Sequence, residues 1–181
     1  MCYSAAALAN YFITKAQREN VQLTHMHLQK MLFFAHAFYF KSTGKPLFVD
    51  PVTAWQHGPV IEPLYYELRQ YGGEAITAQI QRLKRERDNG GVAFRTVTPE
   101  VDPNDGELLR YLDSVWNVLG KEDTWKLRAR SHLEGGAWYK TVAKLKKEDG
   151  SNVNPENDDE VRQYLPRHLT ILDDCIRECG R

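Results

Sequence analysis

Residues 24–44 read THMHLQKMLFFAHAFYFKSTG and predict a buried helix of about five turns, against which the remainder of the chain packs. Thr24 is a residue type that caps the start of a helix, and Gly44 is the type that most easily adopts the left-handed conformation just beyond a helix end. Between these two residues both faces are largely apolar, which is typical of a core helix. The first two turns are polar and the segment is short, so we expect it to lie inside protein and not in a membrane.

The overall composition indicates a soluble globular protein. The chain has 181 residues, with 24 basic and 24 acidic side chains and a formal net charge of zero. This length fits a single domain over residues 1–181. Because its net charge is zero, the protein lacks the overall electrostatic attraction to phosphate that is expected of a general nucleic-acid binder. The three cysteines, Cys2, Cys175 and Cys179, are odd in number and badly placed for disulfides, which predicts a reducing cytoplasm. The N-terminal residues lack the basic region of a signal peptide.

Further helices are predicted from cap residues and apolar spacing. Ser4 begins a helix that ends near Glu19. Asp102 or Asn104 begins another, and a shorter helix follows at about 122–130. Near the C-terminus we expect a helix over residues 159–165 and a final helix from Pro166 that includes Leu169, Cys175 and Cys179.

A small β element completes the predicted fold. Residues 52–55, VTAW, are β-branched and aromatic, and residues 92–97 alternate in polarity, so we expect the two segments to pair as strands. The predicted fold class is therefore mainly α: a compact multi-helix domain around a central buried helix (about 24–43) with a small β element (about 52–55 and 92–97).

Residues 76–87 have the spacing of an amphipathic helix, with a basic face at residues 82–87. Such a face is usually solvated. The alternative is a nucleic-acid-binding regulator that uses residues 82–87, although no aromatic residues are interleaved with the charges there for stacking on bases.

The prolines Pro51, Pro59 and Pro63 make a stiff loop of the segment around Trp55, Gln56 and His57. Polar and aromatic side chains on a rigid loop are suited to binding, but an aromatic residue beside prolines is as often part of the core. The sequence leaves both interpretations open.

A complete catalytic or metal-binding pattern is absent from the sequence. There is no nucleotide-binding glycine loop, nucleophile elbow or acidic metal signature. His25 and His27 lie two residues apart on a helix, so they point to different faces and do not form a metal pair. His57, His132 and Glu134 could form an acid/base cluster, which is the enzyme alternative, but hydrogen bonds that tie loops to helix ends are the commoner role. We assign no catalytic residue, metal or cofactor.

Three segments identify a resemblance to a known family. They are LTHMHLQKMLFFAHAFYFKSTGKPLF, DPVTAWQHGPVIEPLYYELRQYG and SHLEGGAWY. Their Leu-Gln-Lys-x-Leu, Gly-Lys-Pro-Leu-Phe and Ala-Trp-x-x-Gly-Pro-Val patterns resemble the Panacea domain of phage-associated GepA-like and SocA-like proteins. The third segment is similar to the family's Thr-His-x-Glu-Gly-x-Pro-Trp motif, with Ser131 and Ala137 in place of the threonine and the proline. The resemblance covers residues 4–72 well and residues 105–165 loosely.

The resemblance implies a mostly helical, non-enzymatic protein that acts as an antitoxin of a toxin–antitoxin system, often carried by a prophage. Members neutralise a cognate toxin encoded nearby by direct protein contact, and some resemble adaptors that deliver the toxin to a protease. We therefore expect a cytoplasmic protein whose partner is a toxin. If the chain acts as an adaptor, a protease complex is a further partner. The candidate toxin-binding residues are Lys30, Trp55, Gln56, His57, Tyr65, Tyr66, His132, Glu134 and Trp138.

Overall fold

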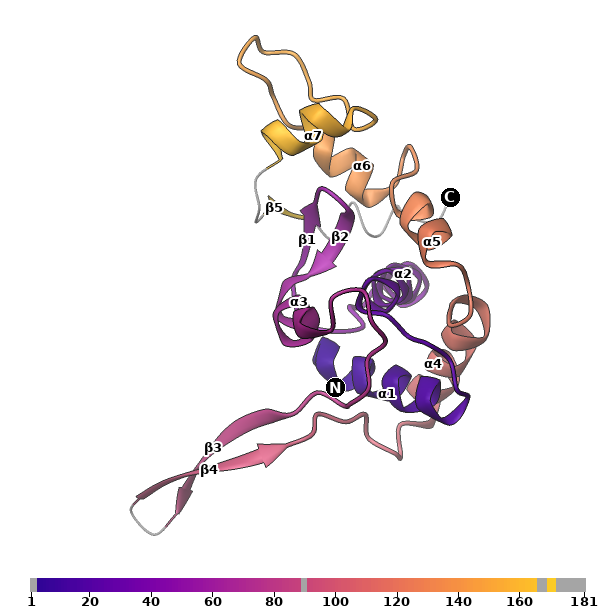
Figure 1. Ribbon diagram of the computed structural model, residues 1–181, viewed down its shortest axis with the longest axis vertical. Helices are drawn as coiled ribbons and strands as arrows, with labels where there is room; N and C mark the ends of the chain where they lie inside the picture. Colours follow the sequence, from indigo (N-terminus) through magenta and orange to yellow (C-terminus); the bar gives the residue numbers. More distant parts are fainter. Residues whose placement is uncertain (1–2, 89–90, 166–168, 172–181) are drawn as a thin grey trace.

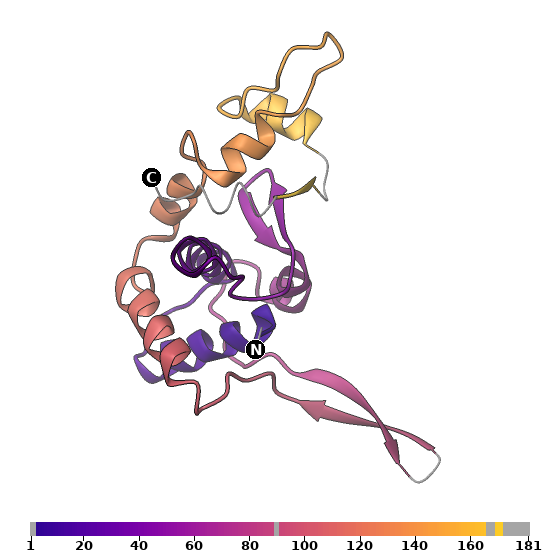
Figure 2. The same ribbon diagram turned by 180° about the vertical axis from the view of Figure 1, so that it is seen from behind.

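The computed structural model describes residues 3–88, 91–165 and 169–171. In chain order, its elements are α1 (Ala5–Arg18), α2 (His25–Thr43), β1 (Val52–Trp55), β2 (Gly58–Ile61), α3 (Glu62–Leu68), the 3-10 turn η1 (Arg69–Tyr71), β3 (Arg82–Asp88), β4 (Gly91–Val97), α4 (Gly106–Leu119), α5 (Thr124–Ser131), α6 (Ala137–Val142), α7 (Asp158–Tyr164) and β5 (Leu169–Thr170). Figures 1 and 2 show the larger helices gathered around α2, with α6 and α7 at one end and the β3–β4 hairpin projecting at the other.

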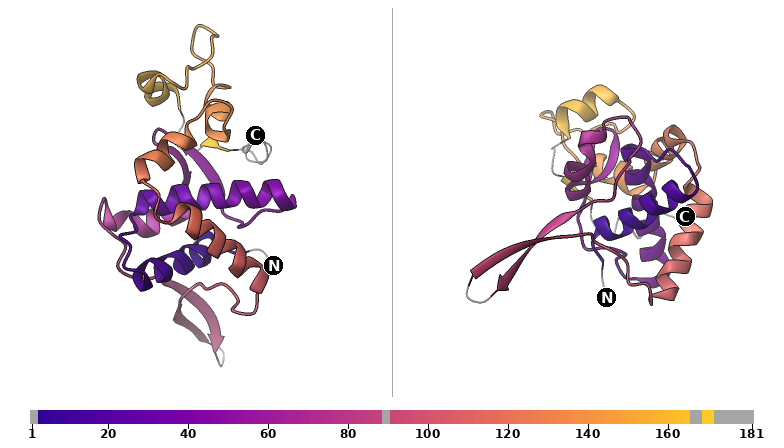
Figure 3. Two further views of the ribbon diagram at one scale, coloured as in Figure 1. Left: turned by 90° about the vertical axis from the view of Figure 1, so that its right-hand side faces the viewer. Right: turned by 60° about the horizontal axis from the view of Figure 1, so that its bottom comes forward.

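Helix α2 lies at the centre of the molecule, as predicted. Thr24 Oγ1 accepts a hydrogen bond from the His27 N–H (3.3 Å), and Gly44, with φ of 69°, donates its N–H to the Phe40 carbonyl (2.8 Å). The helix packs against α1, α3, α4, α5 and β2, and Figure 3 shows it crossing the molecule from side to side. No helix in the described ranges combines the length and apolar character needed to cross a membrane.

The apolar core lies between α1, α2 and α4. Phe12 of α1 stacks on Trp116 of α4 with ring centroids 6.3 Å apart, and both side chains are almost completely buried. Ser4 caps α1 as predicted, whereas the cap of α4 is Asp105, whose carboxylate accepts the Leu108 N–H (3.2 Å). The predicted caps of α4, Asp102 and Asn104, are therefore too early by three residues and by one residue.

The described residues form two separate sheets. In the first, β1 pairs with β2 in an antiparallel hairpin with Trp55 opposite Gly58, and β5 pairs with the other edge of β1. The strand order is β2-β1-β5, so β2 is an edge strand that faces α2. The second sheet is the β3–β4 hairpin alone, with Arg82 opposite Val97 at its base.

The base of the β3–β4 hairpin is held by one buried side chain of α1. The Asn10 amide oxygen accepts the Ile80 N–H (2.7 Å), and its amide nitrogen donates to the carbonyls of Ile80 (3.0 Å) and Pro99 (2.9 Å). Ile80 precedes β3 and Pro99 follows β4, so Asn10 holds both chain segments that enter and leave the hairpin.

The prediction of a mainly α fold is wrong in its proportions, because the chain has a mixed α/β structure in which helices form the larger part. Residues 76–87, predicted as an amphipathic helix, form an extended segment followed by β3. Ile76 and Ile80 are buried as their spacing indicated, but the Ile76 N–H donates to the Leu23 carbonyl (2.9 Å) and that of Ile80 to Asn10, which excludes helical bonding. Residues 92–97 do form a strand, yet they pair with β3 and not with residues 52–55.

The C-terminal prediction is partly wrong as well. Helix α7 agrees with the predicted helix over residues 159–165. The predicted final helix from Pro166 fails at Leu169, which belongs to β5, because Thr170 pairs with Thr53 and the Ile171 N–H donates to the Val52 carbonyl (2.8 Å). The remainder of that helix, with Cys175 and Cys179, lies outside the described residues, as does Cys2.

We predict that Asn10→Ala destabilises the protein by about 2–4 kcal/mol, because three hydrogen bonds are lost and buried backbone groups of Ile80 and Pro99 are left without a partner. Urea unfolding measures the loss, and amide hydrogen exchange in β3 and β4 should accelerate. Gln17→Ala is the matched control on the same helix. Its amide donates to the Thr77 carbonyl (2.9 Å) at an exposed position, so its loss should cost less than about 0.5 kcal/mol. Equal losses in the two variants would contradict this role of Asn10.

Candidate functional site

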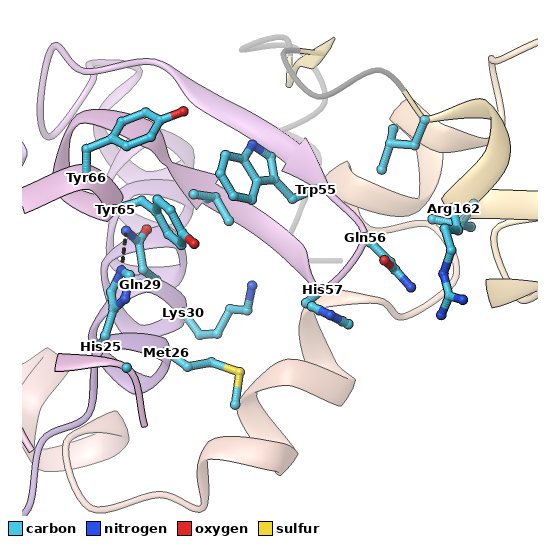
Figure 4. A pocket seen from close by; sticks show the side chains of 14 residues that line it. His25, Met26, Gln29, Lys30, Trp55, Gln56, His57, Tyr65, Tyr66 and Arg162 are labelled. Carbon is cyan, nitrogen blue, oxygen red and sulfur yellow. Dashed lines mark hydrogen bonds between the residues drawn. The ribbon is translucent and has the colours of Figure 1, made fainter. Parts of the chain in front are cut away.

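A groove of about 730 Å³ lies between the start of α2, the turn that joins β1 to β2, helix α3 and helix α7 (Figure 4). Aromatic side chains of β1 and α3 line one side, and polar side chains of α2 and of the β1–β2 turn lie beside them. Of the nine candidate toxin-binding residues, six line this groove: Lys30, Trp55, Gln56, His57, Tyr65 and Tyr66.

The aromatic side chains form a continuous wall. The rings of Trp55 and Tyr65 have centroids 4.7 Å apart, and Tyr65 meets Tyr66 edge to face at 5.5 Å. The Trp55 indole N–H donates to the Glu62 carboxylate (3.3 Å), which fixes the orientation of that ring. Tyr66 is 49% exposed, and the Arg69 guanidinium lies 5.4 Å from its ring centroid. The wall therefore offers aromatic surface that is already ordered and partly open to solvent.

Two consecutive residues of α2 attach the groove to the core. The Gln29 amide oxygen accepts the Ile61 N–H (2.8 Å), and its amide nitrogen donates to the Ile61 carbonyl (3.1 Å). The Lys30 ammonium donates to the Pro59 carbonyl (2.9 Å). Both contacts reach the edge of β2 that is not paired with β1, so the Leu-Gln-Lys pattern of the sequence fixes this strand against α2.

Lys30 is a buried cation, with only 2% of its side chain exposed. Burial and, to a smaller extent, the neighbouring charge of Arg128 together lower its pKa to about 7. Among the described residues no carboxylate lies within ion-pairing distance of its ammonium group. A buried ammonium without a counterion is costly, and it loses its proton near neutral pH for that reason.

The motif SHLEGGAWY holds the β1–β2 hairpin from the other side. His132 Nδ1 lies 2.7 Å from the Arg128 carbonyl, and its ring packs against Trp138 with centroids 4.1 Å apart. The Trp138 indole N–H donates to the Trp55 carbonyl (2.8 Å). Ser131 donates through its hydroxyl to the same Arg128 carbonyl (2.7 Å). These contacts place the SHLEGGAWY motif behind the groove, where it supports the β1–β2 hairpin.

Three candidate residues therefore lie apart from the groove. Trp138 is 1% exposed and belongs to the core, and His132 lies half-buried behind the hairpin. Glu134 is exposed in the loop between α5 and α6 and does not line the groove. Within the described part of the chain, no hydrogen bond joins His57, His132 and Glu134, so the predicted acid/base cluster is not assembled by such bonds. Among all the residues that the structure describes, no group of three or more histidine, cysteine, aspartate or glutamate side chains is placed to hold a metal ion.

The sequence analysis did not assign several residues to the groove, among them Arg162 and His25. Arg162 of α7 lines its far end, and the Gln56 side chain, oriented with its oxygen toward α7, accepts from Arg162 Nε and Nη2, both at 3.2 Å. No local pattern connects these residues, which lie far apart along the chain. His25 also lines the groove, whereas His27 points away and bonds to the Leu119 carbonyl (2.8 Å). The different faces expected for these two histidines are confirmed.

We predict that Gly58→Ala destabilises the protein by more than about 2 kcal/mol. Gly58 has φ of 98°, and an added Cβ would lie 2.8 Å from both Lys30 Nζ and His132 Cε1. Gly44→Ala is the control, because Gly44 also has positive φ (69°) but nothing lies within 4 Å of the added Cβ, so about 1 kcal/mol is expected. Thermal and urea unfolding compare the two variants. Equal costs would show that the close approach at Gly58 is unimportant.

The buried basic groups predict that stability increases with pH. Burial lowers the pKa of His25 and of His132 to about 4 each, below the unfolded value of 6.5, so the unfolded chain binds more protons between pH 4 and pH 6.5. Stability should fall as the pH decreases through this window. The lowered pKa of Lys30 makes stability rise from pH 7 toward pH 10.5 for the same reason.

Urea unfolding at a series of pH values measures both effects. His25→Phe should reduce the slope on the acid side, and Lys30→Met mainly above pH 7, with a smaller reduction on the acid side because the Lys30 charge also lowers the pKa of His25 and of His132. Each site changes stability by at most about 1.4 kcal/mol per pH unit, and partial exposure of the histidines reduces their share. Unchanged slopes in both variants would contradict the assignment of these groups.

Comparison with known proteins agrees with the position of the three motifs. The family described as Antitoxin SocA-like, Panacea domain, matches residues 28–139, which include the α2 motif, the β1–β2 hairpin and the α5–α6 loop. Antitoxin SocA of Caulobacter vibrioides (strain NA1000 / CB15N) is 30% identical over 134 residues, which cover 74% of this chain and 68% of the relative. No solved structure matches the chain. The family match spans more than half of the sequence, and the chain belongs to the SocA-like antitoxin family with the Panacea domain.

Proposed function

We propose that this chain is an antitoxin that neutralises a cognate protein toxin by direct contact, and that the toxin docks in the groove beside Trp55, Tyr65 and Tyr66. The family and the relative named Antitoxin SocA support the antitoxin role. The observation that carries the docking site is the partly exposed aromatic wall along an open groove. Aromatic side chains at the centre of an interface commonly contribute most of its binding energy.

The rigidity of the groove also favours binding of a protein partner. Gln29 and Lys30 fix one side of the β1–β2 hairpin, and Trp138 fixes the other. Because these contacts already order the aromatic wall, little conformational entropy is lost when a partner binds. We infer that the family motifs support the binding surface and that the side chains projecting from it contact the toxin.

Nucleic-acid binding through residues 82–87 is less well supported. These residues form strand β3, so their side chains alternate between two faces and do not form one basic face. Arg82 pairs with Glu67 (2.6 Å) and Lys84 lies 3.9 Å from Glu86, which reduces the free positive charge.

Co-expression tests the proposed function. The chain is expressed in bacterial cells with each protein encoded next to it, and growth, co-purification and toxin amount are measured. Restored growth together with a stoichiometric complex supports neutralisation by binding. A constant amount of bound toxin identifies sequestration, whereas a decreasing amount identifies delivery to a protease. A growth-inhibiting neighbour that is neither bound nor neutralised would contradict the proposal.

We predict that Trp55→Ala and Tyr66→Ala each weaken the toxin complex by about 30-fold or more, because hot-spot aromatic residues contribute at least about 2 kcal/mol. His57→Ala should have a smaller effect in the same direction. Trp125→Ala is the control, since Trp125 is an aromatic residue on α5 that is 66% exposed and lies outside the groove. Binding is measured by calorimetry with variants whose unfolding temperature is unchanged. If only the Trp125 variant loses binding, the docking surface lies elsewhere.

A further inference from the structure

The charges around the groove are unbalanced. Lys30 and Arg162 line it together with two histidines, His25 and His57, and among the residues that the structure describes no aspartate or glutamate lines it. The acidic residues Glu62 and Asp158 lie nearby. Glu62 accepts a hydrogen bond from the Trp55 indole N–H, and the charge of Asp158 partly offsets the burial that lowers the pKa of His57, but neither residue lines the groove. Burial lowers the pKa of His25 and of His57, so at neutral pH the positive charge of the groove comes from Arg162 and from the protonated fraction of Lys30, without a counter-anion among the described lining residues.

Lys30 contributes the most deeply buried of these charges. Its ammonium group has three N–H donors, and the hydrogen bond found for it uses one of them, to the Pro59 carbonyl (2.9 Å). Figure 4 shows its side chain extended from α2 into the space between Trp55 and His57. The titratable and charged groups that interact with it are Arg128 of α5 and the rings of His25, His57 and His132.

Support of the hairpin alone does not require a charge at this position. The neighbouring Gln29 holds the Ile61 carbonyl with a neutral amide at 3.1 Å, so an uncharged donor is sufficient for a backbone carbonyl of β2. A buried ammonium costs far more than a buried amide, and that cost is recovered when an anion pairs with it. The free chain limits this cost because Lys30 loses its proton near neutral pH, and a ligand that carries an anion restores the charge.

The position of Lys30 indicates which part of a partner supplies this anion. Tyr66 lies toward one end of the groove and Arg162 at the other, with Lys30 between them (Figure 4). A peptide segment that runs along the groove presents a side chain, and not its terminus, at this midpoint. The aromatic wall next to Lys30 suits an apolar or aromatic group beside the anion.

We propose that the groove binds an acidic segment of the toxin and that an aspartate or glutamate side chain of this segment forms an ion pair with Lys30, next to an apolar side chain that packs on Trp55 and Tyr65. This inference rests on the proposed function and specifies the chemistry of its partner. Pairing with the carboxylate favours the protonated form of Lys30, so binding takes up a proton at pH 8 and weakens as the pH rises.

The first test uses the isolated full chain and a small probe. 3-Phenylpropionate carries a carboxylate and an aromatic ring, and 3-phenylpropionamide is its uncharged counterpart. NMR of lysine labelled with ¹³C at Cε measures the binding of each probe and the pKa of Lys30. We expect the acid to bind at least about tenfold more tightly than the amide and to raise the pKa of Lys30 by about 1, as expected for a hydrogen bond between charged groups.

Variants separate the charge of Lys30 from its support of β2. Lys30→Gln keeps a donor for the Pro59 carbonyl and removes the charge, so it should bind the acid and the amide equally. Lys41→Met is the control in the last turn of the same helix, where the lysine is exposed, and it should bind like the unmodified chain. Because the pKa of Lys30 is read directly in the unmodified protein, the test stands even if a variant folds poorly. Equal binding of acid and amide by the unmodified chain would overturn the proposal.

The second test uses the complex with the growth-inhibiting neighbour. Lys30→Gln should weaken this complex by tenfold or more at pH 7, with no effect of Lys41→Met. If the complex is unaffected although the acid binds at Lys30, docking of an acidic toxin segment is contradicted while toxin neutralisation stands. If no neighbour is bound but the acid still raises the pKa of Lys30, the antitoxin proposal fails and the anion site is supported.

Discussion

The attachment of strand β2 to helix α2 is the contact on which the remaining structure depends. β2 lies at the edge of its sheet, where unpaired backbone groups would otherwise be buried without partners. Carbonyl groups two residues apart along a strand point in the same direction, and those of Pro59 and Ile61 both face α2. Two adjacent helix residues, Gln29 and Lys30, reach these groups and complete the edge of the strand.

The SHLEGGAWY motif supports the β1–β2 hairpin from the side opposite the groove, and its contacts explain why its two departures from the family pattern are tolerated. Ser131 keeps a hydroxyl group, and that hydroxyl donates to the Arg128 carbonyl (2.7 Å). Ala137 is the first residue of α6, the position at which proline is favoured but where any good helix former is accepted. The loop therefore presents Trp138 to the hairpin in spite of both substitutions.

Local signals in the sequence were sufficient for some elements but not for others. Helices α1 and α2 could be predicted because their caps, Ser4, Thr24 and Gly44, lie in the same stretch as the apolar residues that they bound. The extended segment before β3 could not, because its conformation is set by Asn10, about seventy residues earlier in the chain. The contribution of Arg162 to the groove was missed for the same reason. The aromatic wall was found because Trp55 and Tyr65 lie close together in the sequence.

The β3–β4 hairpin is connected to the body in a way that makes it a separable unit. Asn10 holds the chain on both sides of it, at Ile80 and at Pro99, and the strands beyond these points project away from the core (Figures 1 and 3). Leu83 and Phe94 on these strands are 73% and 66% exposed, so they contribute little to core packing. The segment between Ile80 and Pro99 can consequently vary in length or sequence without altering the hydrogen bonds that shape the groove. The fold thereby allows one surface to diversify while another is held constant.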